Sequence, residues 1–330
     1  MLLYFAMVIC GISLLVWSAD RFTDGAAAIA RNFGISPLVV GLTIVAMGSS
    51  APEVVVSMNA ALNETPGLAL GNAIGSNIAN IAMVLGITAL VVPLKIQSAT
   101  LKREIPILFF FMLLVFYLLS DLILSFSDGI ILITSLVAYL GWLIYVATKS
   151  RAQLDSSTDE CDLMLSEIID ELPDEMPNSK AIIWIVIGLV ILQVSSKMLV
   201  FGATNIAYMF NVTDFVIGIT IVAVGTSLPE LAASVSGVMK GEHELAIGNV
   251  IGSNIFNLLI VLGIPGLITY VPIPANILEL DYAIMFGLTV AMSIMAWGRR
   301  GKPGEINRLE GALLLICFIG YQSYQLFINN

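Results

Sequence analysis

Two carboxylates lie inside stretches of the chain that are otherwise apolar. Glu53 closes the hexapeptide GSSAPE and is the only charged residue of 32–63, and Glu230 closes the similar hexapeptide GTSLPE. An ionised acid inside a membrane is costly unless it is paired, so each acid is by default a functional candidate. We therefore expect Glu53 and Glu230 to bind a charged substrate.

A proline directly precedes each of these acids. Pro52 and Pro229 remove a backbone donor and clash with the carbonyl four residues earlier, so each opens the helix that contains it. The carbonyls of Gly48 and Gly225 then need another partner. Broken helices of this kind are tolerated at membrane depth where they line a cavity or are buried in protein.

A second pair of polar motifs follows the first, GNAIGSNIAN at 71–80 and GNVIGSNIFN at 248–257. Residues four apart share a helical face, which predicts four pairs of neighbours: Ser49 with Glu53, Ser76 with Asn80, Thr226 with Glu230, and Ser253 with Asn257. Four glycines of these motifs permit close helix approach or unwinding: Gly71, Gly75, Gly248 and Gly252.

All of the polar groups in this set offer oxygen ligands, and no His, Cys or Lys joins them. Calcium takes about six to eight oxygens in flexible geometry, and two carboxylates balance the charge of one divalent ion. Sodium would use the same oxygens, so the residues alone predict a hard-cation site. Asn77 and Asn254 either belong to this site or bond neighbouring helices.

The composition places this site in a membrane. Hydrophobic residues make up 58% of the 330 residues and charged residues 12%, and the mean hydropathy is +0.97. Runs long enough to cross the hydrocarbon core recur along the chain, and they predict an all-α polytopic membrane protein with ten transmembrane helices: 2–18, 37–62, 67–92, 104–120, 129–147, 182–201, 214–239, 244–271, 280–297 and 309–328.

The chain contains an internal duplication. Residues 37–87 align without a gap on 214–264 at a constant offset of 177, and 25 of the 51 positions are identical. We predict three parts, a first five-helix repeat at 1–147, an acidic linker at 148–181 and a second five-helix repeat at 182–330. An odd number of spans gives the second repeat the opposite sense, and inverted-topology repeats are typical of secondary transporters.

The basic residues predict the orientation. With the N-terminus and the C-terminus outside, 13 of the 14 Lys and Arg residues fall on the cytoplasmic side, and only Lys197 does not. The linker is then cytoplasmic in a multi-pass protein of the cell (plasma or inner) membrane. It holds nine of the 24 acids, which favours a solvated hinge over a calcium-sensing or partner-binding segment.

Two other classes of protein, an enzyme and a cation channel, fit these residues less well. The hydroxyls of Ser49, Ser50 and Ser227 have no intramembrane His or Lys to act as a base, which argues against an enzyme. A cation channel also uses oxygen-lined filters, but paired acids in inverted repeats suit alternating access better. The three cysteines show no CxxC spacing, so we expect no disulfide, metal centre or cofactor.

The paired motifs resemble those of the cation/calcium antiporter superfamily, and within it the compact prokaryotic sodium/calcium exchangers. GSSAPE with GNAIGSNIAN looks like the first of that family's two signature repeats, and GTSLPE with GNVIGSNIFN like the second. The resemblance in span number and duplication covers essentially the whole chain. It implies a ten-helix bundle whose clustered cation sites serve one calcium or about three sodium ions by turns.

The resemblance also implies roles for individual residues. Glu53 and Glu230 resemble the acids shared among the sites, and the carbonyls of Ala46 and Ala223 match positions used for sodium. The flanking ligands implied in the two copies are Ser49, Ser50, Ser76 and Asn80, and Thr226, Ser227, Ser253 and Asn257. Residues 1–18 and 182–201 look like the family's sliding gate helices.

The sequence departs from the family pattern at two positions. Asn257 stands where potassium-dependent exchangers carry an aspartate, which argues against potassium co-transport. Ser49 replaces the commoner threonine but keeps the hydroxyl. The expected function is a sodium/calcium antiporter that works by alternating access, with proton-coupled calcium exchange as the alternative. Its partners would be calcium and sodium ions and the lipid bilayer, with no nucleic acid and no obligatory protein partner.

Overall fold

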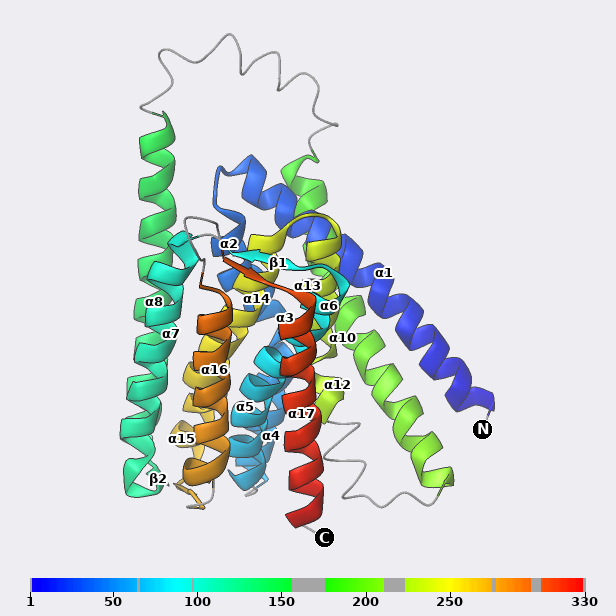
Figure 1. Cartoon of the computed structure of the whole chain (residues 1–330), viewed down its shortest axis with the longest axis vertical. Helices are drawn as coiled ribbons and strands as arrows, with labels where there is room; N and C mark the ends of the chain where they lie inside the picture. Colours follow the sequence, from blue (N-terminus) through cyan, green and yellow to red (C-terminus); the bar gives the residue numbers. More distant parts are fainter. Residues whose placement is uncertain are drawn as a thin grey trace.

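Long apolar helices make up most of the described chain (Figure 1). The computed structural model describes residues 2–63, 66–96, 98–155, 176–210, 223–274, 277–297 and 304–328. Within these ranges, seven helices are long and apolar enough to cross a membrane, or eight if the bent pair Pro37–Ser49 and Ala51–Leu62 is one span. The protein is therefore an all-helical polytopic membrane protein. The count of ten spans remains a prediction.

In the first half of the chain most helices are interrupted by π-helical turns or breaks. Its elements are α1 (Leu2–Asn32), α2 (Pro37–Val40), the π-helix η1 (Gly41–Val45), α3 (Ala46–Ser49), α4 (Ala51–Leu62), α5 (Pro66–Ala79), the π-helix η2 (Asn80–Leu85), α6 (Gly86–Val91), β1 (Leu94–Ile96), α7 (Ser98–Leu118), the 3-10 helix η3 (Leu119–Asp121), β2 (Ile123–Leu124) and α8 (Phe126–Asp155).

The described elements of the second half follow a similar order. Its elements are α10 (Asn178–Met209), α12 (Ala223–Thr226), α13 (Leu228–Met239), α14 (His243–Phe256), the π-helix η5 (Asn257–Val261), α15 (Gly263–Ile268), β3 (Val271–Pro272), the π-helix η6 (Ile277–Tyr282), α16 (Ala283–Met295), β4 (Gly304–Ile306) and α17 (Arg308–Ile328). Most of the predicted linker and the first part of the predicted span 214–239 lie outside the described residues.

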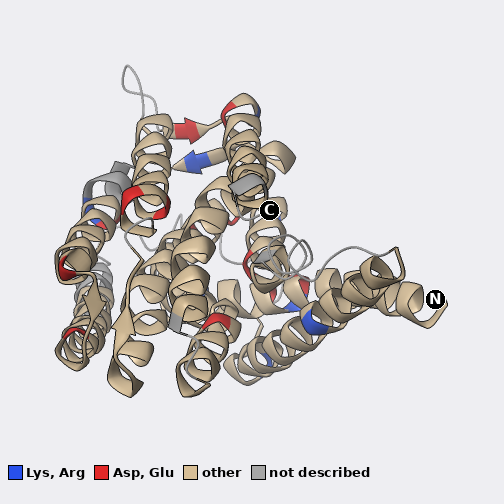
Figure 2. Ribbon diagram, turned by 90° about the horizontal axis from the view of Figure 1, so that it is seen from below, with Lys and Arg blue, Asp and Glu red and all other residues tan. Residues whose placement is uncertain are grey.

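The two halves are joined by reciprocal contacts. Strand β1 pairs with β4 and β2 pairs with β3, so each ribbon takes one strand from each half. The ribbons lie at opposite ends of the bundle (Figure 1). In the β1–β4 ribbon Lys95 faces Glu305, a favourable cross-strand charge pair (Figure 2). Helix α6 packs on α17 and α15 on α8, which repeats the exchange. The inverted membrane sense of the halves remains a prediction.

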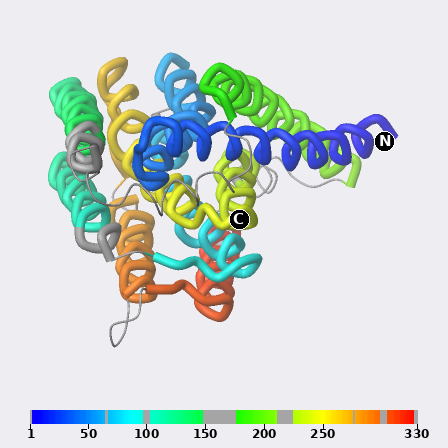
Figure 3. The backbone as a smooth tube through the Cα atoms, turned by 90° about the horizontal axis from the view of Figure 1, so that it is seen from above, coloured from blue at the N-terminus to red at the C-terminus, as the bar shows by residue number. Residues whose placement is uncertain are grey.

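Helices α1 and α10 run side by side along one flank of the bundle (Figures 1 and 3). Glycines allow this approach, because a Cβ on Gly188 would lie 2.9 Å from the backbone of Phe22 and one on Gly25 would lie 2.7 Å from the carbonyl of Ala181. Both helices are longer than the predicted gate helices 1–18 and 182–201.

The hydropathy pattern predicts that the first span ends at residue 18, before the first charged residues. Helix α1 instead continues through these charged residues. Lys240, at the end of α13, lies 2.6 Å from the Asp20 carboxylate and 2.7 Å from that of Asp24. The alanine-rich segment that follows is buried and favours helix. The ion pairs and this packing carry the helix on to Asn32.

Helix α14 packs tightly against η1 and α2 through its glycines. A Cβ on Gly248 would lie 2.6 Å from the carbonyl of Leu38, and one on Gly252 would lie 2.7 Å from the Cβ of Ala46. The predicted close approach is confirmed at these two positions. A Cβ on Gly71 or Gly75 meets no described atom within 4 Å, and the repeat equivalents of η1 lie outside the described residues.

We predict that Gly248→Ala will lower the unfolding temperature of the purified protein, because the added methyl group must displace backbone atoms of α2. Overpacking of this kind costs about 1–3 kcal/mol. The matched control is Gly320→Ala in α17, where a Cβ meets nothing within 4 Å and alanine favours the helix. Equal melting temperatures for wild type and Gly248→Ala would contradict this packing.

Candidate cation-binding site

The helix that carries each acid is broken three residues before it. Ser50 separates α3 from α4 with φ −81° and ψ 7°, and Ser227 separates α12 from α13 with φ −89° and ψ 6°. The first pair of helices is bent by 45°. Each acid therefore lies in the first turn of a new helix. The free N–H groups and the dipole at a helix start favour a negative charge there.

The carbonyls opened by the prolines find partners on a third helix. The side-chain amide of Gln193 donates to the carbonyl of Gly48 at 3.2 Å, and the hydroxyl of Ser196 donates to the carbonyl of Gly225 at 2.8 Å. The prediction that these two carbonyls need another partner is confirmed. Both donors come from α10, so this helix contacts the breaks of both halves.

The serine at the first break bonds the acid of the other half. Ser50 and Glu53 have the S-x-x-E spacing of a capping box, yet the Ser50 side chain makes no cap bond. Its hydroxyl donates instead to the Glu230 carboxylate at 3.0 Å. Ser227, its counterpart, has a buried hydroxyl without a hydrogen-bond partner among the described residues. The two hexapeptides therefore meet at one point.

Both acids are enclosed by the bundle. Glu53 is 1% exposed and Glu230 0% exposed. The two carboxyl groups are close enough for their negative charges to repel each other. One buried oxygen of each has no hydrogen-bond partner in the described part of the chain. No described Lys or Arg forms an ion pair with either acid. Two like charges in such surroundings require neutralisation by a cation or by protons.

Asparagines of the second motif pair lie on π-turns that contact the helices of these acids. Asn80 begins the π-helix η2 and Asn257 begins η5. Both side chains are buried, and neither the oxygen nor the nitrogen of either amide has a partner among the described residues. Helix α4 contacts η5 and α13 contacts η2, so the helix of each acid packs on the asparagine turn of the other half. Such π-turns occur frequently at functional sites.

Ser49 connects the first motif with α14. Its hydroxyl donates to the side-chain oxygen of Asn249 at 3.0 Å and lies 3.5 Å from the hydroxyl of Ser253. The structure thus brings together Ser49 and Ser253 from the two halves. The prediction that Ser49 and Glu53 share one face of the same helix is wrong, because the break at Ser50 places them on different helices. The same applies to Thr226 and Glu230 across Ser227.

Comparison with known proteins assigns the chain to a family. A family model described as sodium/calcium exchanger protein matches residues 3–151 and 180–327. The chain belongs to this family. Among the relatives of this exchanger-family chain, the Escherichia coli inner membrane protein YrbG is 41% identical over 319 residues and aligns with 97% of this chain and 95% of YrbG.

Two further relatives have functional names. CaxA of Alkalimonas amylolytica, which is named as an antiporter, is 47% identical over 327 residues, with 99% of each chain covered. The sodium/calcium exchanger MaX1 of Methanosarcina acetivorans is 30% identical over 343 residues, with 96% of this chain and 97% of MaX1 covered. These are names of transporters, with which a protein that is not an enzyme is consistent.

The fold also matches a solved exchanger. The structure of the sodium-calcium exchanger NCX_Mj superposes with a TM-score of 0.81 at 29% identity, and the match covers 98% of both chains. The resemblance to prokaryotic sodium/calcium exchangers that the motifs indicated is therefore confirmed.

The remaining predicted ligands of this exchanger-family chain lie on α3, α5 and α12. Ser76 is buried in α5, and Thr226 ends α12. Ala46 begins α3, and its carbonyl accepts the N–H of Ser50 at 3.0 Å and faces the Ser49 hydroxyl at 3.4 Å. Ala223 begins α12. Their roles as ligands remain predictions.

Two asparagines at the start of the second motifs were not predicted as site residues. The Asn72 amide donates to the carbonyl of Glu53 and to the hydroxyl of Ser57, both at 3.0 Å. The Asn249 amide donates to the carbonyl of Glu230 at 3.1 Å and to the hydroxyl of Ser234 at 2.9 Å. Each asparagine therefore fixes the backbone of one acid. Their identity in both copies of the repeat was the signal that could have found them.

Asn249 also accepts from Ser49, so its side chain holds groups of both halves. We predict that Asn249→Ala will raise, about tenfold, the calcium concentration at which protection against thermal unfolding is half-maximal. A change of this size is typical when a group that orients ligands is lost. Asn63→Ala, in an exposed position at the end of α4, should leave it unchanged. A wild-type calcium dependence in Asn249→Ala would contradict this positioning role.

Proposed function

We propose that the protein exchanges sodium for calcium across its membrane by alternating access. The observation that carries the proposal is the bond from Ser50 to Glu230, which joins the two helix breaks that carry the buried carboxylates. The second break and the π-turns in contact with the helices of the acids carry buried hydroxyl and amide groups that have no hydrogen-bond partner among the described residues. These groups would provide a charge of −2 and several neutral oxygens. That set suits one divalent calcium ion or several sodium ions.

The proposed site consists of the residues implied by the motifs. Glu53 and Glu230 would be shared by calcium and sodium, which would compete for them. The other ligands proposed are Ser49, Ser50, Ser76, Asn80, Thr226, Ser227, Ser253, Asn257 and the carbonyls of Ala46 and Ala223. The membership of the chain in an exchanger family supports this assignment.

The access route would change by displacement of the pair formed by α1 and α10. This pair touches the candidate site through Gln193 and Ser196, whose bonds end on carbonyls of the two helix breaks. A shift of α10 would exchange these bonds and so alter the breaks of both halves together. Alternating access requires such a link between the moving helices and the ion ligands.

The proposed orientation follows from the basic residues. The end of the bundle that carries β1–β4, where α8 ends and α10 begins, would face the cytoplasm (Figure 1). Both termini would then be external and the membrane would be the cell membrane. The clustering of Lys and Arg in the corresponding loops supports this arrangement.

Proton-coupled calcium exchange is the second candidate. It rests on the same observation, because two enclosed carboxylates without a basic partner in the described part of the chain can be neutralised by protons as well as by sodium. The two functions differ in the gradient that drives calcium uptake.

Proteoliposomes separate these candidates. Vesicles loaded with sodium and diluted into sodium-free buffer should accumulate calcium, and a pH gradient of matched size should not drive uptake. Uptake driven only by the pH gradient would show that the protein is a proton-coupled calcium exchanger. Calcium entry without either gradient would indicate a channel.

We predict that Glu53→Gln and Glu230→Gln will each reduce calcium uptake by at least about a hundredfold, because one negative charge of the proposed site is lost and the buried cation loses a charged partner. Glu279→Gln is the matched control, since this carboxylate is exposed on η6. The variants should elute as wild type in size-exclusion chromatography. Full uptake by either variant of Glu53 or Glu230 would contradict the proposed site.

A further inference from the structure

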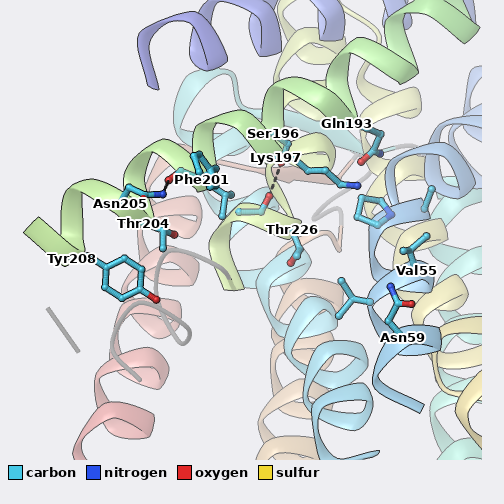
Figure 4. A pocket seen from close by; sticks show the side chains of 15 residues that line it. Val55, Asn59, Gln193, Ser196, Lys197, Phe201, Thr204, Asn205, Tyr208 and Thr226 are labelled. Carbon is cyan, nitrogen blue, oxygen red and sulfur yellow. Dashed lines mark hydrogen bonds between the residues drawn. The ribbon is translucent and has the colours of Figure 1, made fainter. Parts of the chain in front are cut away.

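A cavity of about 770 Å³ opens beside the candidate site, between α4, α10 and α12 (Figure 4). Its wall includes Thr226 and the two residues before Glu53, Ala51 and Pro52. The cavity therefore extends from the broken helices along α10 as far as Tyr208. A cation that reaches the carboxylates by this route must pass the side chains of its wall.

Lys197 is the one Lys or Arg in the described wall of this cavity. It is exposed, and its side chain extends from α10 across the cavity toward α4 (Figure 4). Among the described residues no carboxylate lies within ion-pair distance of its ammonium group. It therefore adds a positive charge to the approach to a site that carries two negative charges.

The position of Lys197 is held by its neighbours on α10. Ser196 bonds the carbonyl of Gly225, and Gln193, one turn earlier, bonds the carbonyls of Gly48 and Ser49 at 3.2 and 3.4 Å. These bonds, made in the turn that precedes the lysine, join α10 to both helix breaks. The backbone of Lys197 is thus held beside the two helix breaks that the cavity reaches.

We propose that Lys197 is a specificity-determining residue, whose ammonium group lowers the affinity of the site for divalent cations more than for monovalent cations. The proposal rests on the proposed function, in which the site takes both calcium and sodium. Coulomb repulsion grows in proportion to the charge of the ion. The positive charge therefore raises the half-saturating concentration of calcium more than that of sodium and assists the release of calcium.

The effects of the lysine charge on sodium and on calcium are related in a way that does not depend on distance or dielectric constant. The logarithm of each binding constant changes in proportion to ion charge. If removal of the lysine charge tightens binding of each sodium ion by a factor f, it tightens binding of calcium by f squared. For a separation of about 10 Å and an effective dielectric constant of about 60, f is about 2.5 and its square about 6.

The test compares three variants of the purified full-length chain. Lys197→Gln removes the charge, and Lys197→Arg keeps it. Lys180→Gln removes an exposed charge near the start of the same helix, about 26 Å away at the rise of an α-helix. The half-saturating concentrations of calcium and of sodium for protection against thermal unfolding are measured at constant ionic strength, with choline as the replacement cation.

The expected result is a fall of about 2.5-fold for sodium and about 6-fold for calcium in Lys197→Gln, with Lys197→Arg and Lys180→Gln as in wild type. Both factors should shrink at high ionic strength, because salt screens the charge. Equal factors for the two ions, no change, or the same change in Lys197→Arg would overturn the proposal.

This measurement separates the two proposals, since binding is read without transport. A wild-type protein that binds both cations but fails to exchange them in vesicles would overturn the proposed function. The proposal on Lys197 would then stand or fall on the measured changes in the half-saturating concentrations of the two cations. A wild-type protein protected by neither cation would overturn both proposals.

Discussion

Two carboxylates held together inside an apolar bundle are the constraint on which the rest of this structure depends. Glu53 and Glu230 are almost fully buried, and no described Lys or Arg pairs with either. Their charges must be balanced by something that enters and leaves, or by protons. The prolines before them and the breaks at Ser50 and Ser227 place both acids at helix starts, where the backbone tolerates negative charge.

The duplication supplies the second part of the arrangement. Each half contributes one acid, one broken helix and one π-turn with a buried asparagine, and the contacts run between halves: Ser50 with Glu230, Ser49 with Ser253, α4 with η5 and α13 with η2. The ribbons β1–β4 and β2–β3 repeat the exchange at the two ends of the bundle. A site assembled in this way requires both halves, so neither is expected to bind a cation alone.

Much of this site could be predicted from the sequence, because the acids and the prolines that open their helices break an otherwise apolar pattern. The need of Gly48 and Gly225 for new partners followed from the proline chemistry. The donors could not be predicted, since Gln193 and Ser196 correspond to Val16 and Ala19 in the other half and carry no repeat signal.

Spacing along the chain was a weaker guide. The four-residue spacing of Ser49 and Glu53 implied one helical face, whereas the break at Ser50 separates them and the bonds of Ser49 lead to α14. Hydropathy ended the first helix near residue 18, but ion pairs of Asp20 and Asp24 with Lys240 allow it to continue. The second difference arises from contacts between residues more than 200 positions apart, which local patterns do not record.

The most direct test of the account is the position of a bound calcium ion. Crystals of the protein grown with calcium and without sodium should give one strong anomalous peak from calcium, with oxygens of both Glu53 and Glu230 about 2.3–2.6 Å away. The peak should weaken when sodium replaces calcium. A calcium peak that touches only one of these acids, or lies outside the junction of the two halves, would contradict the account.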